Sequence, residues 1–234
     1  IYRSLEAFNK LDKAVVTSGT FDGVHVGHQK ILSRLNEIAQ RNGGETVLIT
    51  YWPHPRLLLY PDQPFKLLSS IDEKARLLEK AGISHFIVIP FTHEFAQLSS
   101  EDFIKRILVD KIGTKKLVIG YNHRFGKNRE GSFEALQKNS HRYGFEIEEI
   151  PKQMIDHLSV SSTKIRKALE TGMLDHAIEY LGRPYALTGT VITGDKIGRK
   201  LGFPTANLHI DFEEKLIPAD GIYAVKLRHQ RTLY

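Results

Sequence analysis

The feature that most constrains this chain is a regular alternation between short apolar runs and amphipathic helical patterns. It begins with the apolar run at 14–19 and the pattern at 28–40, whose apolar positions fall on one helical face. Strands that alternate with helices pair in parallel through right-handed crossovers. We therefore predict an α/β domain with a doubly wound parallel sheet. The further strand candidates are ETVLITY, HFIVIP, KKLVIG and FEIEEI, and a helical pattern precedes each of the last three.

Local signals mark the ends of these elements. Four prolines between 53 and 64 interrupt the alternation, and we expect this stretch to lack regular structure. Ser70 and Glu73 form a capping-box pattern that predicts a helix over 72–81, ended by Gly82. Ligands of doubly wound sheets bind at the carboxyl ends of the strands. The chemistry is therefore expected in the loops after residues 18, 51, 90 and 120.

The pattern changes after Arg183 and Pro184. Two short helical patterns, SSTKIRKALETG and LDHAIEYLG, precede this point. The later segments ALTGTVITG and GIYAVKLR are rich in β-branched and aromatic residues and are separated by Gly and Pro turns, with no helix expected between them. We predict an α/β domain at 1–183 and the start of an all-β domain at 184–234. Because 50 residues follow Pro184, we expect the natural protein to be longer.

Composition narrows the classes of function. The 234 residues carry a formal net charge of +6 and include no Cys, which excludes disulfides and thiolate metal sites. No apolar run approaches the ~18 residues of a membrane span, and no export signal precedes the first predicted strand. We therefore expect a cytoplasmic protein with no membrane partner. The positive charge permits an anionic ligand, but no contiguous basic stripe indicates nucleic acid.

The motif with the strongest chemical content is GTFDGVHVGH at 19–28, between the first strand and the first helix. Its glycines let backbone amides approach a ligand, and the helix N-terminus directs N–H groups and positive dipole at the same point. His25 and His28 lie on one side of the first turn and can donate to phosphoryl oxygens. The alternative is a pair of structural histidines that cap a turn. The glycines expected to approach the anion are Gly19, Gly23 and Gly27.

A second basic motif, VSSTKIR at 160–166, opens the helical pattern after the fifth strand. Ser161, Ser162 and Thr163 supply hydroxyl groups at a helix start. Lys164 and Arg166 supply cationic donors for phosphate oxygens. A helix cap with a solvated basic turn is the alternative interpretation.

Two further loops could contact a substrate. In GYNHRFGKNREG at 120–131, Asn122 and Arg124 are placed to meet it, and a glycine lets the chain fold over it. In WPHP, His54 could touch a ligand while the prolines fix the loop. A plain surface loop and a Trp packed against the sheet are the alternatives.

The last motif, GDKIGRKLGFPTANL at 194–208, lies in the predicted β domain. Gly198 and Gly202 form a flexible cradle beside the positive charge of Arg199. Thr205 and Asn207 offer oxygen ligands suited to Mg²⁺. A long hairpin with solvated basic residues is the alternative.

The motif HVGH resembles the HxGH signature of nucleotidyltransferases, which transfer a nucleoside monophosphate from a triphosphate. The succession GTFDGVHVGH, PHP, GYNHRFG, SSTKIR and GRKLGFPTANL resembles the bacterial bifunctional riboflavin kinase/FMN adenylyltransferase family, also called FAD synthetases, over essentially the whole chain. The resemblance implies a Rossmann-like domain of the HxGH type, followed by the start of a riboflavin kinase β-barrel. It also implies ATP, FMN and riboflavin as substrates, FAD as product and Mg²⁺ as cofactor.

The resemblance implies roles for the predicted positions. The FMN phosphate attacks the ATP α-phosphorus in line, which needs positioning and charge neutralisation. The sequence departs from the commoner family forms at two places. It has Asn122 and His123 where several members carry aspartate or another aromatic residue, and it has Tyr51 and Trp52 before the prolines. The implied catalytic residues are His25, His28 and Arg166; the implied ATP ligands are Gly19, Phe21, Asp22, Gly23, Gly27, Ser161, Ser162, Thr163 and Lys164; the implied flavin ligands are His54, Asn122 and Arg124; the implied kinase residues are Gly198, Arg199, Gly202, Thr205 and Asn207, with Thr205 and Asn207 on the metal.

The kinase half of this family uses a glutamate base several strands after the PTAN run. Only 27 residues follow Asn207, and Glu213 and Glu214 lie too close to it. We therefore expect no kinase activity in this chain, with adenylylation retained. The alternatives are a transferase for pantetheine phosphate, nicotinamide mononucleotide or a cytidylyl group, an RNA-binding relative of class I aminoacyl-tRNA synthetases, and a non-catalytic flavin-binding module.

Overall fold

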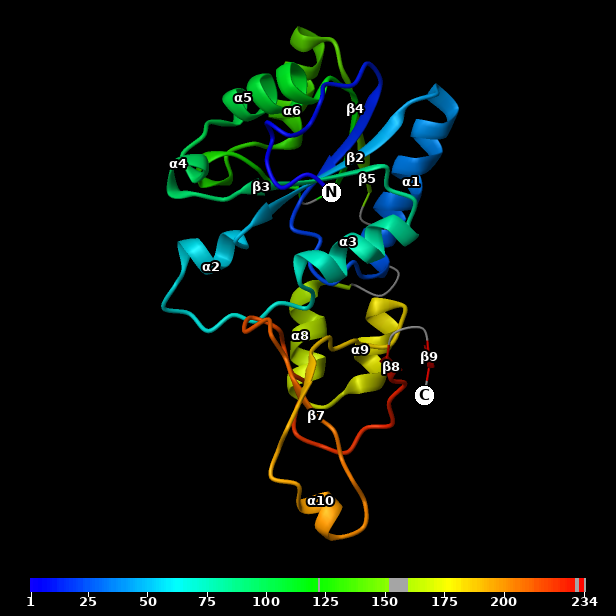
Figure 1. Cartoon of the computed structure of the whole chain (residues 1–234). Helices are drawn as coiled ribbons and strands as arrows, with labels where there is room; N and C mark the ends of the chain where they lie inside the picture. The colour runs from blue at the N-terminus through cyan, green and yellow to red at the C-terminus, as the bar shows by residue number, and fades with distance from the viewer. Residues whose placement is uncertain (122, 152–159, 230–231, 234) are drawn as a thin grey trace.

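Five parallel strands form the centre of the upper part of the molecule (Figure 1). The computed structural model describes residues 1–121, 123–151, 160–229 and 232–233. The strands pair in the order β3-β2-β1-β4-β5, and every pairing is parallel. The predicted doubly wound parallel sheet is confirmed. Its strands are β1 (Ala14–Ser18), β2 (Glu45–Trp52), β3 (His85–Pro90), β4 (Thr114–Gly120) and β5 (Glu146–Ile150).

The strand order reverses between β1 and β4. From β1 the chain moves outward to β2 and β3, and it then returns to pair β4 with the other edge of β1. A ligand crevice opens outside the carboxyl ends of the strands at such a switch point. The Oγ atom of Ser18, at the end of β1, lies 3.0 Å from Nε2 of His123 in the loop after β4. The two central strands are therefore linked where the crevice is expected.

Helices cover both faces of the sheet (Figure 1). On one face, α1 (Val26–Asn42) and α3 (Ile71–Lys80) share a buried core with Val15 of β1. On the other face, η1 (Phe103–Ile112), wound as a π-helix, and α6 (Phe133–Tyr143) share a core with Val16. Alternate residues of β1 thus face opposite layers, as strand geometry requires. Two short helices, α4 (His93–Ala96) and α5 (Ser100–Asp102), precede η1.

A third, smaller core lies below the sheet. It is built by α8 (Ser162–Glu170) and α9 (Leu174–Leu181), which pack Ile165 and Leu169 against Leu68. Leu216, from the C-terminal part of the chain, belongs to the same core. This small core therefore joins the part of the chain that holds the parallel sheet to the residues after Pro184.

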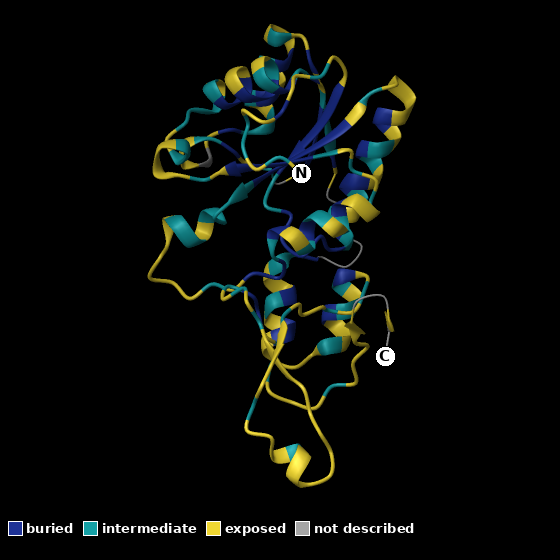
Figure 2. Cartoon of the chain, in the orientation of Figure 1, coloured by how far each residue is buried: buried dark blue, intermediate teal, exposed yellow. Residues whose placement is uncertain are grey.

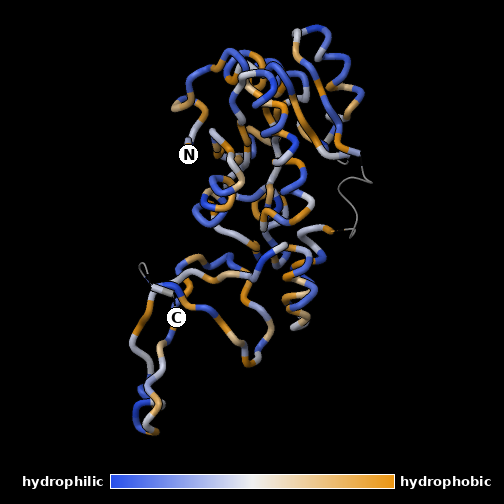
Figure 3. Tube along the Cα trace, turned by 90° about the vertical axis from the view of Figure 1, so that its right-hand side faces the viewer, coloured by the Kyte–Doolittle hydropathy of each residue, from blue (hydrophilic) through white to orange (hydrophobic). Residues whose placement is uncertain are grey.

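The residues after Pro184 form two short antiparallel pairs. β6 (Thr190–Ile192) pairs with β7 (Asn207–His209), and β8 (Arg228–His229) pairs with β9 (Thr232–Leu233). Figure 2 shows that this lower part is mostly exposed, and Figure 3 shows hydrophobic residues along its extended arms. The predicted beginning of a β domain is thus present as separate strand pairs. No helix in the described part of the chain has the length and apolar character needed to cross a membrane.

Two local predictions are wrong. The proline-rich stretch contains the helix α2 (Pro55–Leu59), because a proline is tolerated in the first turn and His54 Nδ1 accepts a hydrogen bond from the Arg56 backbone N–H. A one-turn helix, α10 (Ile197–Lys200), lies between the two β segments, where no helix was expected. The capping box is confirmed, since Ser70 and Glu73 exchange both of its hydrogen bonds.

Candidate active site

The loop between β1 and α1, residues 19–28, folds into a tight corner, called the first corner below. Phe21 and Val24 adopt positive φ angles of 46° and 41° although they are not glycines. Such backbone costs ~1–3 kcal/mol per residue and persists only where packing enforces it. Both side chains are buried, and a Cβ on Gly23 would lie 2.8 Å from Cδ1 of Leu68. The first corner is therefore fixed by its surroundings.

The two histidines of the HVGH motif lie face to face. Their ring centroids are 3.6 Å apart with an interplanar angle of 17°. His25 is the N-cap of α1, and its Nδ1 accepts a hydrogen bond of 3.3 Å from the His28 backbone N–H. The alternative interpretation gave both histidines a role in capping a turn. In the structure, the N-cap of α1 is His25.

Burial keeps both imidazoles neutral. It lowers the pKa of His25 to about 4, and Arg183 and Arg166 add to the shift while Asp22 opposes it. Burial also lowers the pKa of His28 well below its ordinary value, with His25 and Lys74 adding to the shift. A neutral imidazole whose Nδ1 accepts a hydrogen bond carries its proton on Nε2. His25 can therefore donate from Nε2, while Nδ1 of His28 is buried without a hydrogen-bond partner among the described residues.

The first corner and the start of α8 meet directly. Ser162 Oγ donates a 2.9 Å hydrogen bond to the carbonyl oxygen of Asp22. The Arg166 guanidinium forms an ion pair of 2.5 Å with the Asp22 carboxylate. Ser161 caps α8 by accepting from the Lys164 backbone N–H. The two motifs thus form one structural unit, although 144 positions separate Asp22 and Arg166.

Asp22 and Arg166 are held largely by protein groups. The Asp22 carboxylate is buried and accepts hydrogen bonds of 3.1 Å from the backbone N–H groups of Leu68 and Ser69. The Arg166 guanidinium also donates to the Lys66 carbonyl oxygen and lies 4.3 Å from the centroid of Phe65. Both side chains therefore organise the corner, and their direct contact with ATP stays a prediction.

Two cations that the sequence analysis missed hold the carbonyl groups of the first corner. Lys74 Nζ, on the buried face of α3, donates a 2.6 Å hydrogen bond to the Thr20 carbonyl oxygen. Burial lowers the pKa of Lys74 to about 8. Arg183 donates to the carbonyl oxygens of Val24 and Gly23. The charge at the corner is thus positive, which favours an anionic ligand.

The predicted flavin-side residues lie in different places. The ring centroid of His54 is 4.9 Å from that of Phe65, and burial lowers the pKa of His54 to about 4. Arg124 is exposed in the loop after β4. Asn122 lies outside the described residues. His54 therefore lies close to the Phe65–Arg166 pair, whereas the other two assignments stay predictions.

Aromatic rings gather at the carboxyl ends of β2, β3 and β4. The ring centroid of Tyr51 lies 5.8 Å from that of Phe91 and 5.7 Å from that of Phe95. Phe103 and Phe125 continue the series at 5.4 Å. Phe103 and Phe125 are buried in the core, so only the partly buried rings of Tyr51, Phe91 and Phe95 offer apolar area with defined geometry to a planar ligand. Periodicity alone could not find this group, because its members come from separate strands, helices and loops.

The remaining predicted positions lie in the first corner and in the first turn of α8. The Gly19 backbone N–H donates to the Ile49 carbonyl oxygen, and Gly27 is buried in the first turn of α1. Thr163 and Lys164 are exposed in the first turn of α8.

The PTAN motif lies after α10 and ends at the first residue of β7, on the side of α8 and α9 away from the sheet (Figure 1). An added Cβ on Gly198 would lie 3.1 Å from Thr205 Oγ1, and one on Gly194 would lie 2.2 Å from Asn207 Nδ2. The loop is therefore folded on itself, with Thr205 and Asn207 against glycine backbone. Arg199 and Gly202 are exposed beside them.

The parallel sheet, its switch point and the histidine-bearing first corner define a nucleotidyltransferase domain of the HxGH type. Comparisons with known proteins give the family. The family model described as FAD synthetase matches residues 8–164, and the model described as riboflavin kinase matches residues 181–234.

Two similar proteins carry the same name. The bifunctional riboflavin kinase/FMN adenylyltransferase of Buchnera aphidicola subsp. Schizaphis graminum is 39% identical over 97% of this chain and 73% of its own length. The protein of that name from Listeria monocytogenes is 39% identical over 92% and 68%. A crystal structure described as a macrolide-efflux protein from Streptococcus pneumoniae has a TM-score of 0.88 and 29% identity, over 99% of this chain and 75% of that one. This chain belongs to the bifunctional riboflavin kinase/FMN adenylyltransferase family.

Proposed function

We propose that this chain forms FAD by transferring the AMP group of ATP to FMN, with release of pyrophosphate. The observation that carries the proposal is the junction of Asp22 with Ser162 and Arg166, which unites the two phosphate-binding motifs. Two neutral histidines and the N-terminus of α1 lie at this junction. The names of the relatives support the same activity.

The reaction requires alignment and charge stabilisation. An oxygen of the FMN phosphate forms a bond to the α-phosphorus of ATP. The bond from that phosphorus to the oxygen that bridges the α- and β-phosphates breaks, and its electron pair leaves with pyrophosphate. His25 Nε2–H donates to one phosphoryl oxygen, and an N–H of the neighbouring His28 ring donates to a second. Lys74, Arg166 and Arg183 keep the corner positive, so that charge developing on the oxygens is stabilised.

We assign the flavin side to the loops after β2 and β4. His54, Asn122 and Arg124 are the proposed polar contacts, and the aromatic group around Tyr51 supplies planar surface. The ATP contacts are proposed at the first corner and at Ser161, Ser162, Thr163 and Lys164.

The second part of the proposal concerns residues 184–234 as a separate, riboflavin-phosphorylating domain, with 1–183 as the adenylyltransferase domain. Thr205 and Asn207 would hold Mg²⁺ together with ATP phosphates, since two neutral oxygen ligands suit a cation that phosphates also bind. Bound Mg²⁺ would neutralise phosphate charge. Of the predicted cradle glycines, Gly198 lies against Thr205, whereas nothing lies within 4 Å of a Cβ added at Gly202; Gly194, which was not predicted, lies against Asn207.

Absence of riboflavin kinase turnover in the 234-residue chain stays a prediction. Conversion of riboflavin to FMN above background would contradict it. A cytoplasmic location, supported by the absence of Cys, and the absence of nucleic-acid and membrane partners also stay part of the proposal.

The test is incubation of the chain with FMN, ATP and Mg²⁺, followed by chromatography for FAD and pyrophosphate. We expect both products in equal amounts. Parallel reactions replace FMN by pantetheine phosphate or nicotinamide mononucleotide. Faster adenylylation of either compound, or no pyrophosphate with FMN, would contradict the proposal.

A further inference from the structure

Residues 66–69, called the strap below, lie between the first corner and the C-terminal segment 213–216. On one side, the strap pairs with the segment 213–216. The Leu67 backbone N–H donates to the Glu214 carbonyl oxygen at 2.7 Å, and the Leu216 N–H donates to the Leu67 carbonyl oxygen at 2.8 Å. The segment 213–216 lies within the part of the chain that the riboflavin kinase model matches.

The other side of the strap holds the proposed ATP corner. The backbone N–H groups of Leu68 and Ser69 bind the Asp22 carboxylate, and the Lys66 carbonyl oxygen accepts from Arg166 Nε at 2.7 Å. The position of the strap therefore sets the geometry of the Asp22–Arg166 pair.

The side chain of Lys215 adds a link between the strap and a second element. It is only 4% exposed, and its Nζ donates 2.8 Å to the Leu68 carbonyl oxygen and 2.6 Å to Glu73 Oε2. Glu73 belongs to the capping box of α3, the helix that carries Lys74. One ammonium group thus joins the strap to α3, and each of them holds one part of the first corner.

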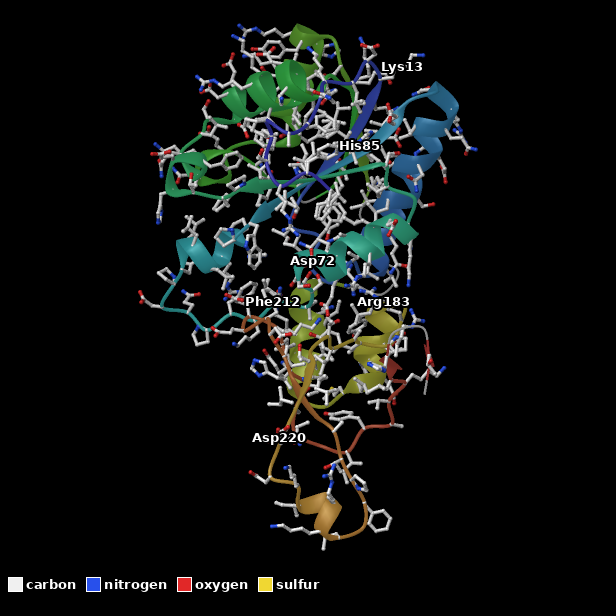
Figure 4. All side chains as sticks on the ribbon, in the orientation of Figure 1. Lys13, Asp72, His85, Arg183, Phe212 and Asp220 are labelled. Atoms are coloured by element: carbon white, nitrogen blue, oxygen red, sulfur yellow. The ribbon has the colours of Figure 1, made fainter. Side chains whose placement is uncertain are left out.

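A second contact from the same segment reaches another site loop. Phe212 lies 5.7 Å from Trp52, measured between ring centroids, and Trp52 precedes the His54 loop. Both rings line a groove of about 360 Å³ with Asp72 and Lys215. Figure 4 labels Asp72 and Phe212, which come from the two sides of this groove.

Stability alone is a weak reason for this buried ion pair. Taking two charges out of water is costly, and replacing a buried pair by apolar side chains is often neutral or stabilising. Burial lowers the pKa of Lys215, while Glu73 opposes the shift. What the ammonium group does in the structure is connect the Leu68 carbonyl oxygen of the strap to Glu73 of α3.

We propose that Lys215 is a positioning residue for adenylyl transfer, so that the part of the chain matched by the riboflavin kinase model completes the FMN adenylyltransferase site. This inference rests on the proposed function. On this inference, the geometry of the first corner depends on a side chain from residues 181–234, the part that the riboflavin kinase model matches.

The test compares Lys215→Met, Lys215→Arg and Lys226→Met in the whole chain. Lys226 is an exposed lysine of the same region and serves as the matched control. Steady-state FAD formation is measured at a temperature where circular dichroism shows every variant folded. We expect kcat to fall on the order of 10- to 100-fold in Lys215→Met, since small displacements of catalytic geometry cost this much. We expect Lys215→Arg to recover a large part of this loss and Lys226→Met to match the parent.

Amide hydrogen exchange of residues 66–69 and 19–28 gives a second readout that needs no substrate. We expect faster exchange in both segments of folded Lys215→Met and unchanged exchange in Lys226→Met. Parent-like kcat and KM in Lys215→Met would overturn the inference, as would unchanged exchange in both segments. A parent chain that forms no FAD would instead refute the proposed function, and the exchange result would still decide whether Lys215 fixes the corner.

Discussion

Residues 1–183 and 184–234 bury their apolar side chains very differently. In the first region, side chains such as Leu35 and Ile49 are fully buried in the two layers around the sheet. In the second region, Phe203 is 78% exposed and Leu201 is 70% exposed. Leu216 is the one buried apolar side chain among the described residues after Pro184, and it packs against α8 and α9.

This difference in burial follows from how parallel and antiparallel sheets cover their apolar faces. Each crossover helix of a parallel sheet covers a face of the sheet as the chain proceeds, so burial is achieved within the α/β unit. A two-stranded antiparallel pair such as β6–β7 needs another layer or further strands to bury its apolar face. The first region is thus expected to supply the stability and the second to be anchored to it through the 213–216 segment.

The largest expected effect separates the two regions by stability. We expect Leu35→Ala to lower the free energy of unfolding by ~2–5 kcal/mol, because it leaves a cavity in a packed core. The matched change Leu201→Ala removes an exposed side chain and is expected to stay within ~0.5 kcal/mol. Urea unfolding of both variants measures this difference. Equal losses would break the comparison.

The next effect separates the regions by activity. We expect His28→Ala to lower kcat for FAD formation by about 10²- to 10³-fold, the usual effect of losing a donor that stabilises transition-state charge. His209→Ala, which changes an exposed histidine of the second region, is expected to retain parent activity. His28→Gln keeps an N–H donor and guards against a folding defect. Unchanged FAD formation in folded His28→Ala would remove the catalytic role.

The third effect is acid sensitivity in the first region. The pKa of His25 is about 4 in the folded chain against an ordinary 6.5. Between these values the unfolded chain binds a proton that the folded chain does not, so the free energy of unfolding falls as pH drops from 6.5 toward 4.

The matched variant for this effect is His25→Asn, since Asn can also cap α1. We expect it to lose about 2 kcal/mol less than the parent between pH 6.5 and 4.5, as one withheld proton is worth ~1.4 kcal/mol per pH unit. Urea midpoints at the two pH values, with the m-value, provide the measurement. Parallel losses in parent and variant would contradict the assignment to His25.

The smallest effect compares helix caps. We expect Ser70→Ala to cost ~1 kcal/mol, because the capping box of α3 loses its side-chain acceptor. The N-cap of α10, Lys196, makes no side-chain capping bond, so Lys196→Ala is expected to change stability by less than ~0.5 kcal/mol. Thermal unfolding of the two variants distinguishes them, and a larger loss in Lys196→Ala would reverse the ranking.

Local patterns were sufficient for most of the first region. Helical periodicity predicted α1, and the spacing of Ser70 and Glu73 predicted the start of α3. The α2 helix was not predicted, because four prolines close together indicate irregular structure. Pro55 nevertheless lies in the first turn of α2, where a proline is tolerated. The strand segments after Pro184 were predicted longer than they are, since β propensity depends on neighbours that pair and pack.

The candidate site was predictable only where its residues are near in sequence. His25 and His28 share one helical turn, so their proximity follows from spacing. The contacts of Lys74 with Thr20 and of Lys215 with Glu73 depend on how distant segments pack. One signal was available, since Lys74 stands between Ile71 and Leu78 on the apolar face of α3, where a lysine needs a buried partner.

The most direct test of a shared nucleotide site is amide hydrogen exchange with and without a methylene-bridged ATP analogue and Mg²⁺. The account predicts slower exchange in both 19–28 and 161–166 at the same analogue concentration, and no matched change in 190–209. Protection of only one of the two motifs in a chain that forms FAD would contradict the claim that both hold one triphosphate.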